Sequence, residues 1–152
     1  MAARSTFTRM CEELSRVLTP RLQAAGYTPP REPFSRDTLK YEFTRPDPNG
    51  AQVLEILFNK YRKPLFWVQI YIAPPAGLSM LIEKGGTLRI GHLSSSFRMW
   101  PLPLRPFRAE PTRLERLLGR RADPIRGAID SFFSLLSEIE AWWSHQRSTR
   151  HI

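Results

Sequence analysis

The sequence predicts an α+β fold: an N-terminal helix, a four-stranded antiparallel sheet and two C-terminal helices packed on the sheet. Apolar residues recur every three or four positions near both ends of the chain, whereas apolar and polar residues alternate in the middle. Short turn sequences separate the alternating segments, which favours an antiparallel meander. Because 152 residues suit one domain, we expect residues 1–152 to form a single domain.

The first predicted element is a helix over residues 6–25. Its apolar positions follow a single helical stripe: Phe7, Met10, Cys11, Leu14, Val17, Leu18, Leu22 and Ala25. Ser5 or Thr6 can cap its start, and Gly26 ends it. Pro20 lies inside and can kink the last turn. Both helices at the ends of the chain should pack on the sheet.

Four strands are predicted over residues 38–44, 52–60, 65–73 and 87–93. A turn at 46–50 ends in Asn-Gly, a typical hairpin sequence. One face of these strands is apolar and would carry Leu39, Tyr41, Phe43, Leu54, Ile56, Phe58, Phe66, Val68, Ile70 and Ile72. The sheet should therefore bury that face.

The opposite sheet face is less polar than a solvated face normally is. It would carry Glu55, Leu57, Trp67, Gln69 and Tyr71. Either a second helix covers this face or it is a contact surface. We expect the helix, because layered folds usually cover apolar sheet faces.

The C-terminal part begins with an irregular connector over about 94–111, rich in proline and arginine. A short basic helix can open at Pro111 or Thr112 and reach Arg121. The last helix should start at the Asp123 cap, with Pro124 at its first position, and run to about residue 146. Its broad apolar stripe predicts deep burial.

The charge is strongly basic and concentrated in one stretch. The formal net charge is +9, and residues 84–126 hold ten basic and three acidic residues. Such a surface attracts nucleic acid or an acidic protein. A compositional origin is equally open, because 19 arginines against 4 lysines, with 14 prolines, also fit a GC-rich genome.

No catalytic constellation stands out in the sequence. Cys11 lies on the apolar helical stripe, so we expect a buried structural cysteine. The histidines His92, His145 and His151 lack metal-ligand spacing. We therefore expect a non-enzymatic protein with no cofactor and no metal site.

Two carboxylates lie on neighbouring strands of the predicted sheet. Glu42 and Glu55 could face each other on neighbouring strands across the 46–50 turn. Such a pair can perform acid–base chemistry in a hydrolase that has a concave pocket around both. Such carboxylates more often alternate with lysines as cross-strand charge pairs, here with Lys40 and Lys60, and we favour this interpretation.

Aromatic and arginine side chains are the candidate binding residues, since these types dominate protein interfaces. For a protein partner, acidic in character, they are Trp67, Tyr71, Trp100, Arg105 and Arg108. The alternative is a nucleic-acid-binding protein that uses the basic 84–126 segment, through Arg89, Arg98, Arg113, Arg116, Arg120 and Arg121. No RNA-recognition or helix-turn-helix signature supports this alternative.

The remaining expectations concern location. No apolar run approaches the roughly 18 residues of a membrane span. The N-terminus lacks the apolar core of a signal peptide. We expect a soluble cytoplasmic protein with no membrane partner.

Several local patterns resemble a known family. They include Phe7, Leu14, the Leu-Thr-Pro at 18–20, Leu22, the Gly-Tyr at 26–27, Tyr41, Arg45, residues 54–61 and 66–68, and the late Trp142 and Trp143. Together they resemble the domain-of-unknown-function 4304 family of small bacterial proteins. The resemblance implies an intracellular α+β domain without catalytic residues to carry over. It also associates the chain with toxin-neutralising immunity proteins or accessory binding proteins.

Overall fold

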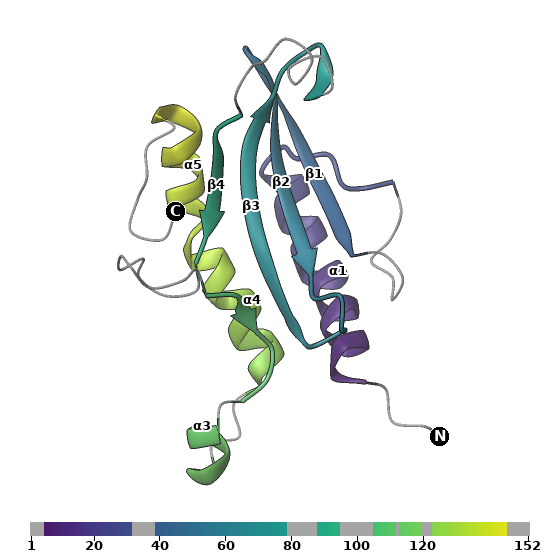
Figure 1. The fold of residues 1–152 in the computed structure, drawn as a ribbon, viewed down its shortest axis with the longest axis vertical. Helices are drawn as coiled ribbons and strands as arrows, with labels where there is room; N and C mark the ends of the chain where they lie inside the picture. Colours follow the sequence, from purple (N-terminus) through teal and green to yellow (C-terminus); the bar gives the residue numbers. More distant parts are fainter. Residues whose placement is uncertain are drawn as a thin grey trace.

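The computed structural model describes residues 5–31, 39–78, 88–94, 105–111, 113–119 and 123–145. Its helices are α1 (Thr6–Ala24), α3 (Arg113–Leu117), α4 (Pro124–Ser134) and α5 (Leu136–His145). Its strands are β1 (Lys40–Asp47), β2 (Gly50–Phe58), β3 (Leu65–Ala73), β4 (Ile90–Leu93) and β5 (Phe107–Arg108). The predicted α+β class is confirmed, with the N-terminal helix, the antiparallel meander and C-terminal helices on the sheet (Figure 1).

The sheet runs in the order β1-β2-β3-β4, and all neighbouring strands are antiparallel. The tight connection between Asp47 and Gly50 sets the register, and the Asn49 backbone N–H donates to Asp47 Oδ1 at 2.9 Å. Strand β5 also pairs with β3, through Leu65–Arg108 and Phe66–Phe107. It lies in the segment that was predicted to be an irregular connector. It was not predicted as a strand because two residues are too few to show an alternation pattern.

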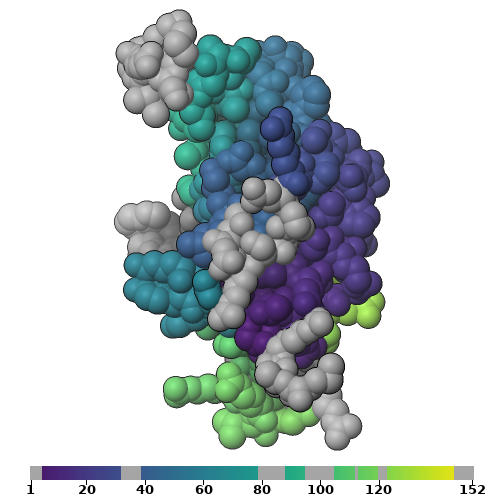
Figure 2. All heavy atoms as spheres, turned by 90° about the vertical axis from the view of Figure 1, so that its right-hand side faces the viewer, coloured from purple at the N-terminus to yellow at the C-terminus, as the bar shows by residue number. Residues whose placement is uncertain are grey.

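One face of the sheet forms the core with three helices. Buried residues of α1, α4 and α5 join alternate residues of β1, β2 and β3 in a single cluster. Phe7 packs edge-on against Phe58 at 5.6 Å between ring centroids, and Phe107 stacks on Phe66 at 5.1 Å. Figure 2 shows α1, in purple, to one side of the strands.

The expectation that a second helix covers the opposite face is wrong for the described part of the chain. Val53, Glu55 and Tyr71 are buried but do not belong to the cluster that α1, α4 and α5 join. The physical reason is that these three helices share one core, while α3 has no buried residue.

The C-terminal region differs in detail from the prediction. The predicted last helix is broken at Leu135, whose backbone N–H bonds to Phe132 O in a tighter turn and separates α4 from α5. Asp123 caps α4 as predicted, accepting from the backbone N–H of Ile125 and Arg126. The described part of the short basic helix ends at Leu117, and the fourth strand begins at Ile90 rather than at residue 87.

A cluster around Arg45 joins the ends of three elements. Its guanidinium lies 4.5 Å from the Tyr27 ring centroid and donates to Ala25 O at 3.0 Å and to Glu140 at 2.7 Å. Trp143 Nε1 donates to the Tyr27 hydroxyl at 2.9 Å. These contacts tie the end of α1 to β1 and α5.

Within the described residues, no helix has the length and apolar character needed to cross a bilayer.

Candidate functional site

The candidate site is the sheet face opposite α1, α4 and α5, which we call the second face. The strand register arranges its residues in rows across the sheet. One row is wholly polar and consists of Glu42, Glu55, Gln69 and His92. The next row on one side contains Lys40, Leu57 and Trp67, and the row on the other contains Thr44, Val53, Tyr71 and Ile90.

The Glu55 carboxylate is the centre of a hydrogen-bonded network on this face. Only 3% of the residue is exposed. Tyr71 OH donates to Oε1 at 2.8 Å, Lys40 Nζ lies 3.2 Å from the same oxygen, and Gln69 Nε2 donates to Oε2. Lys40 also contacts Glu42 at 2.5 Å, so one ammonium bridges two carboxylates. Both carboxylate oxygens of Glu55 are therefore satisfied, as burial requires.

The network fixes the charge state of its members. Burial alone would raise the pKa of Glu55, but hydrogen bonds from Gln69, Tyr71 and Lys40 outweigh it and hold the pKa below its ordinary value. Burial and the bond to Glu55 raise the pKa of Tyr71. Hydrogen bonding to Glu42 is the largest cause that raises the pKa of Lys40. At neutral pH, Glu55 is a carboxylate beside a protonated Lys40.

Apolar side chains lie beside this network. Leu57, Leu65 and Trp67 are partly exposed, and Trp67 pairs with Leu57 across β2 and β3. Arg108 is exposed and pairs with Leu65. Because the neighbouring Phe107 lies in the core, strand alternation places Arg108 on the second face. The structure thus places Trp67, Tyr71 and Arg108 from the predicted protein-binding set on the same face, at successive positions along β3.

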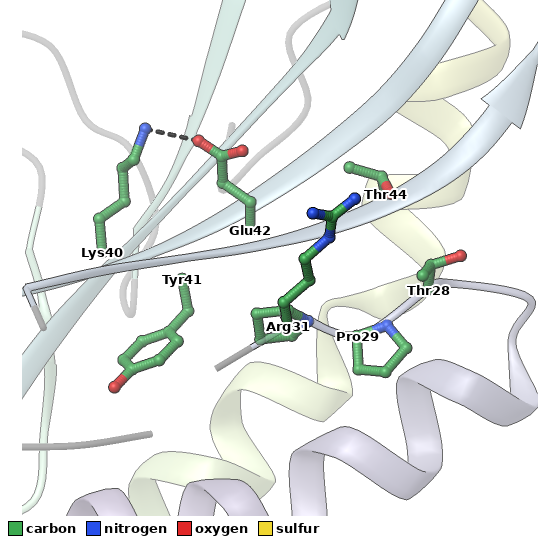
Figure 3. Close-up of a pocket in the computed structure, with 8 residues that line it drawn as sticks. Thr28, Pro29, Arg31, Lys40, Tyr41, Glu42 and Thr44 are labelled. Carbon is green, nitrogen blue, oxygen red and sulfur yellow. Dashed lines mark ion pairs between the residues drawn. The ribbon is translucent and has the colours of Figure 1, made fainter. Parts of the chain in front are cut away.

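An open hollow of about 490 Å³ lies beside the edge strand β1 (Figure 3). Its lining comes from residues 28–31 and from Lys40, Tyr41, Glu42 and Thr44. Lys40 and Glu42 point to one side of β1 and Tyr41 to the other. The bridge between Thr28 and Thr44 fixes the 28–31 segment against the strand. The lysine and glutamate in the hollow pair with each other, and Arg31 adds a further cation to its lining.

The geometry bears on the hydrolase interpretation of Glu42 and Glu55. The register pairs these two residues directly, as predicted. Glu42 lines the hollow, but Glu55 does not, and both carboxylates contact the same ammonium. A general acid requires a raised pKa, whereas the pKa of Glu55 is lowered. The arrangement matches the predicted cross-strand pairing for Lys40; the other lysine, Lys60, instead lies 4.9 Å from the Tyr61 ring centroid.

The other predicted binding residues are dispersed. Arg105 is exposed and uses its backbone N–H to bond the buried Ser94 hydroxyl at 3.1 Å. Trp100 and the alternative nucleic-acid residues Arg98, Arg120 and Arg121 lie outside the described residues.

The three remaining arginines of that alternative, Arg89, Arg113 and Arg116, are all exposed. Arg89 precedes Ile90, which pairs with Tyr71 near one end of β3. Helix α3 instead follows Arg108, which pairs with Leu65 at the other end of β3. The structure therefore separates these arginines between the two ends of the sheet.

The structure also shows where the cysteine and two of the three histidines lie. Cys11 is buried, as predicted, and burial together with the charge of Glu12 raises its thiol pKa to about 11. His92 is exposed on the second face, and His145 is exposed at the end of α5. His151 lies outside the described residues. No group of three metal-ligating side chains occurs within the part of the chain described.

Sequence analysis missed the convergence of Lys40, Gln69 and Tyr71 on Glu55. The alternation of β2 and β3 already placed Glu55, Gln69 and Tyr71 on one face, but which side chains bond to Glu55 depends on the strand register.

Comparisons of the chain with protein-family models, with curated proteins and with solved structures found no match. The resemblance to the domain-of-unknown-function 4304 family stays a prediction.

Proposed function

We propose that the protein is a non-enzymatic protein-binding module, of the immunity or adaptor kind, and that its second face contacts the partner. The observation that supports this is the asymmetry of the sheet. All three described helices that enter the core do so from one face, whereas the other face carries half-buried apolar residues beside a fixed polar network.

Trp67 is the proposed central anchor. It is partly exposed and lies in the same row as Leu57 and Lys40. A tryptophan beside aliphatic neighbours can lose further apolar area to a partner at little conformational cost. Tyr71 has a different role in this proposal, because it is buried and its hydroxyl is bonded to Glu55. It positions the polar row rather than contacting the partner.

The exposed charges of the second face indicate the character of the partner. Arg108 is exposed, whereas Lys40, whose side chain is half exposed, already pairs with Glu42 and Glu55, so Arg108 is the cation this face offers to a partner. Glu55 is buried and already paired. A partner with carboxylates placed around an apolar centre would complement this face.

The test is an affinity pull-down of the tagged full chain from native lysate, divided into nuclease-treated and untreated halves. Wild-type protein is compared with Trp67→Ala and with the matched control Tyr61→Ala, an exposed aromatic in the β2–β3 turn. We expect one stoichiometric protein in both halves with wild type and control, and its loss with Trp67→Ala.

Equal retention by Trp67→Ala would overturn the assignment of the second face. Material that is retained only without nuclease would instead support the nucleic-acid alternative. Circular dichroism of each variant shows that loss of binding is not loss of folding.

A further inference from the structure

One end of the molecule gathers two segments that are far apart in the sequence. The β2–β3 turn (residues 59–64) meets β5 where Leu65 pairs with Arg108 and the Ala109 N–H donates to Pro64 O at 2.8 Å. Helix α3 follows directly and projects from the lower end of the molecule (Figure 1). We call residues 59–64, 107–111 and 113–119 the basic tip.

The basic tip carries a concentrated positive charge. Its two acidic residues are Glu110 and Glu115, against six basic residues, which gives a net charge of +4. All six are exposed: Lys60, Arg62, Lys63, Arg108, Arg113 and Arg116. Half of them come from the β2–β3 turn, outside the 84–126 stretch in which the sequence concentrates charge.

The turn has a defined conformation. Asn59 Oδ1 accepts from the Tyr61 N–H at 2.9 Å, and Asn59 O accepts from the Arg62 N–H at 2.8 Å. Arg62 has a φ of 57°, in the left-handed region that residues of tight turns adopt. Lys60, Tyr61 and Arg62 are therefore presented outward together.

Apolar side chains project from the same tip. Leu114 and Leu117 in α3 and Leu118 directly after it are 65%, 83% and 61% exposed, and their three- and four-residue spacing places them on one side of this segment. Tyr61 in the turn is 71% exposed. Several large apolar side chains exposed at one end of a molecule are typical of an interaction surface.

We propose that the basic tip binds an anionic membrane surface from the outside. The leucines of α3 and Tyr61 would enter the headgroup region, while the surrounding cations contact lipid phosphates and carboxylates. We expected no membrane partner from the sequence because no segment can span a bilayer. Binding at the membrane surface, however, does not require a membrane-spanning segment. The tip shares Arg108 with the second face, but the other side chains on which this proposal depends lie outside that face.

The composition of the tip favours this occupant over two others. A protein groove would take the leucines of α3 but leave the cations of the turn without a role. A nucleic acid would use the cations and could stack on Tyr61, but it has no use for three adjacent leucines. A soft anionic surface contacts both segments at once.

The test is co-sedimentation of the full chain with vesicles of phosphatidylcholine, alone or with about one third phosphatidylserine. We expect binding only to the anionic vesicles, weakening as salt is raised. Leu117→Ser should lower the partition coefficient about tenfold. Each of Lys60→Gln, Arg62→Gln and Lys63→Gln should lower it about fivefold.

Matched controls lie beyond the other end of β3. Leu78→Ser and Arg89→Gln remove the same types of exposed side chain there and should leave vesicle binding unchanged. A parallel arm uses a single-stranded oligonucleotide of about 20 nucleotides.

Absence of binding to anionic vesicles at low salt would overturn the proposal, as would binding that Leu117→Ser leaves intact. Oligonucleotide binding that depends on Lys60, Arg62 and Lys63, without vesicle binding, would assign the tip to nucleic acid instead. Trp67→Ala should keep vesicle binding, so failure here and failure of the proposed function are distinguishable.

Discussion

The two faces of the sheet are built from the same strands but differ in what stabilises them. The first face buries aromatic and aliphatic side chains against α1, α4 and α5. The second face buries a carboxylate and satisfies it with Lys40, Gln69 and Tyr71, next to a partly exposed Trp67. The first face therefore holds the fold together, whereas the second face can change or bind with less effect on stability.

The largest expected effect belongs to the first face. Phe132 is fully buried and packs edge-on against Phe107 at 6.0 Å between centroids. Phe132→Ala should lower the free energy of unfolding by about 3–5 kcal/mol, since it leaves a cavity between α4 and the sheet. Denaturant titration measures it, and a loss below about 1 kcal/mol would contradict the assigned core.

The Glu55 network should show the next largest effect. Glu55→Gln removes the charge that Lys40 and Tyr71 bond, so we expect a loss of about 2 kcal/mol at neutral pH. The pKa of Glu55 is lowered by folding, so its contribution is present above its ordinary pKa of about 4.3 and disappears as the pH falls through the folded value.

The stability difference between wild type and Glu55→Gln should therefore be largest at neutral pH and should shrink in acid. Thermal or denaturant unfolding from pH 7 downward measures this. A difference that stays constant across the range would show that the carboxylate charge is not stabilised by folding.

The hairpin between β1 and β2 serves both faces, and a change there should have a local effect of similar size. Gly50 has a φ of 139°, and a Cβ there would lie 1.9 Å from Ala73 O. Gly50→Ala should cost about 2 kcal/mol. The matched control is Gly127→Ala in α4, where a Cβ meets no atom within 4 Å. It should stabilise by about 0.5–1 kcal/mol, and equal effects at both sites would contradict the backbone geometry.

The smallest effect on stability is expected at Trp67. It is partly exposed and lies outside the core cluster, so Trp67→Ala should cost about 1 kcal/mol, well below Phe132→Ala. The same denaturant titration compares the two aromatics directly. A loss as large as that of Phe132→Ala would mean that both faces are core.

Much of this fold follows from local sequence patterns. The stripe of α1 runs from Phe7 to Leu22, Asp123 caps α4, and the Asn-Gly turn places β1 against β2. These signals are readable because each depends on residues that are close in sequence.

Other features depend on tertiary contacts and could not be predicted. Strand β5 pairs with β3, where Phe107 stacks on Phe66, and Leu135 interrupts the last helix between α4 and α5. The same holds for the candidate sites. Trp67 and Tyr71 were named from residue type and strand alternation, and Arg108 from residue type. The approach of the β2–β3 turn to the segment that leads into α3, in contrast, requires the pairing of β3 with β5.

The most direct test of the central claim combines stability and binding in one variant. Trp67→Ala and wild type are compared by thermal unfolding and by nuclease-treated pull-down. We expect Trp67→Ala to stay folded, with a melting temperature about 2–4 °C lower, and to lose the stoichiometric partner. A folded Trp67→Ala protein that retains this partner at the wild-type level would contradict the claim that the second face is the binding surface.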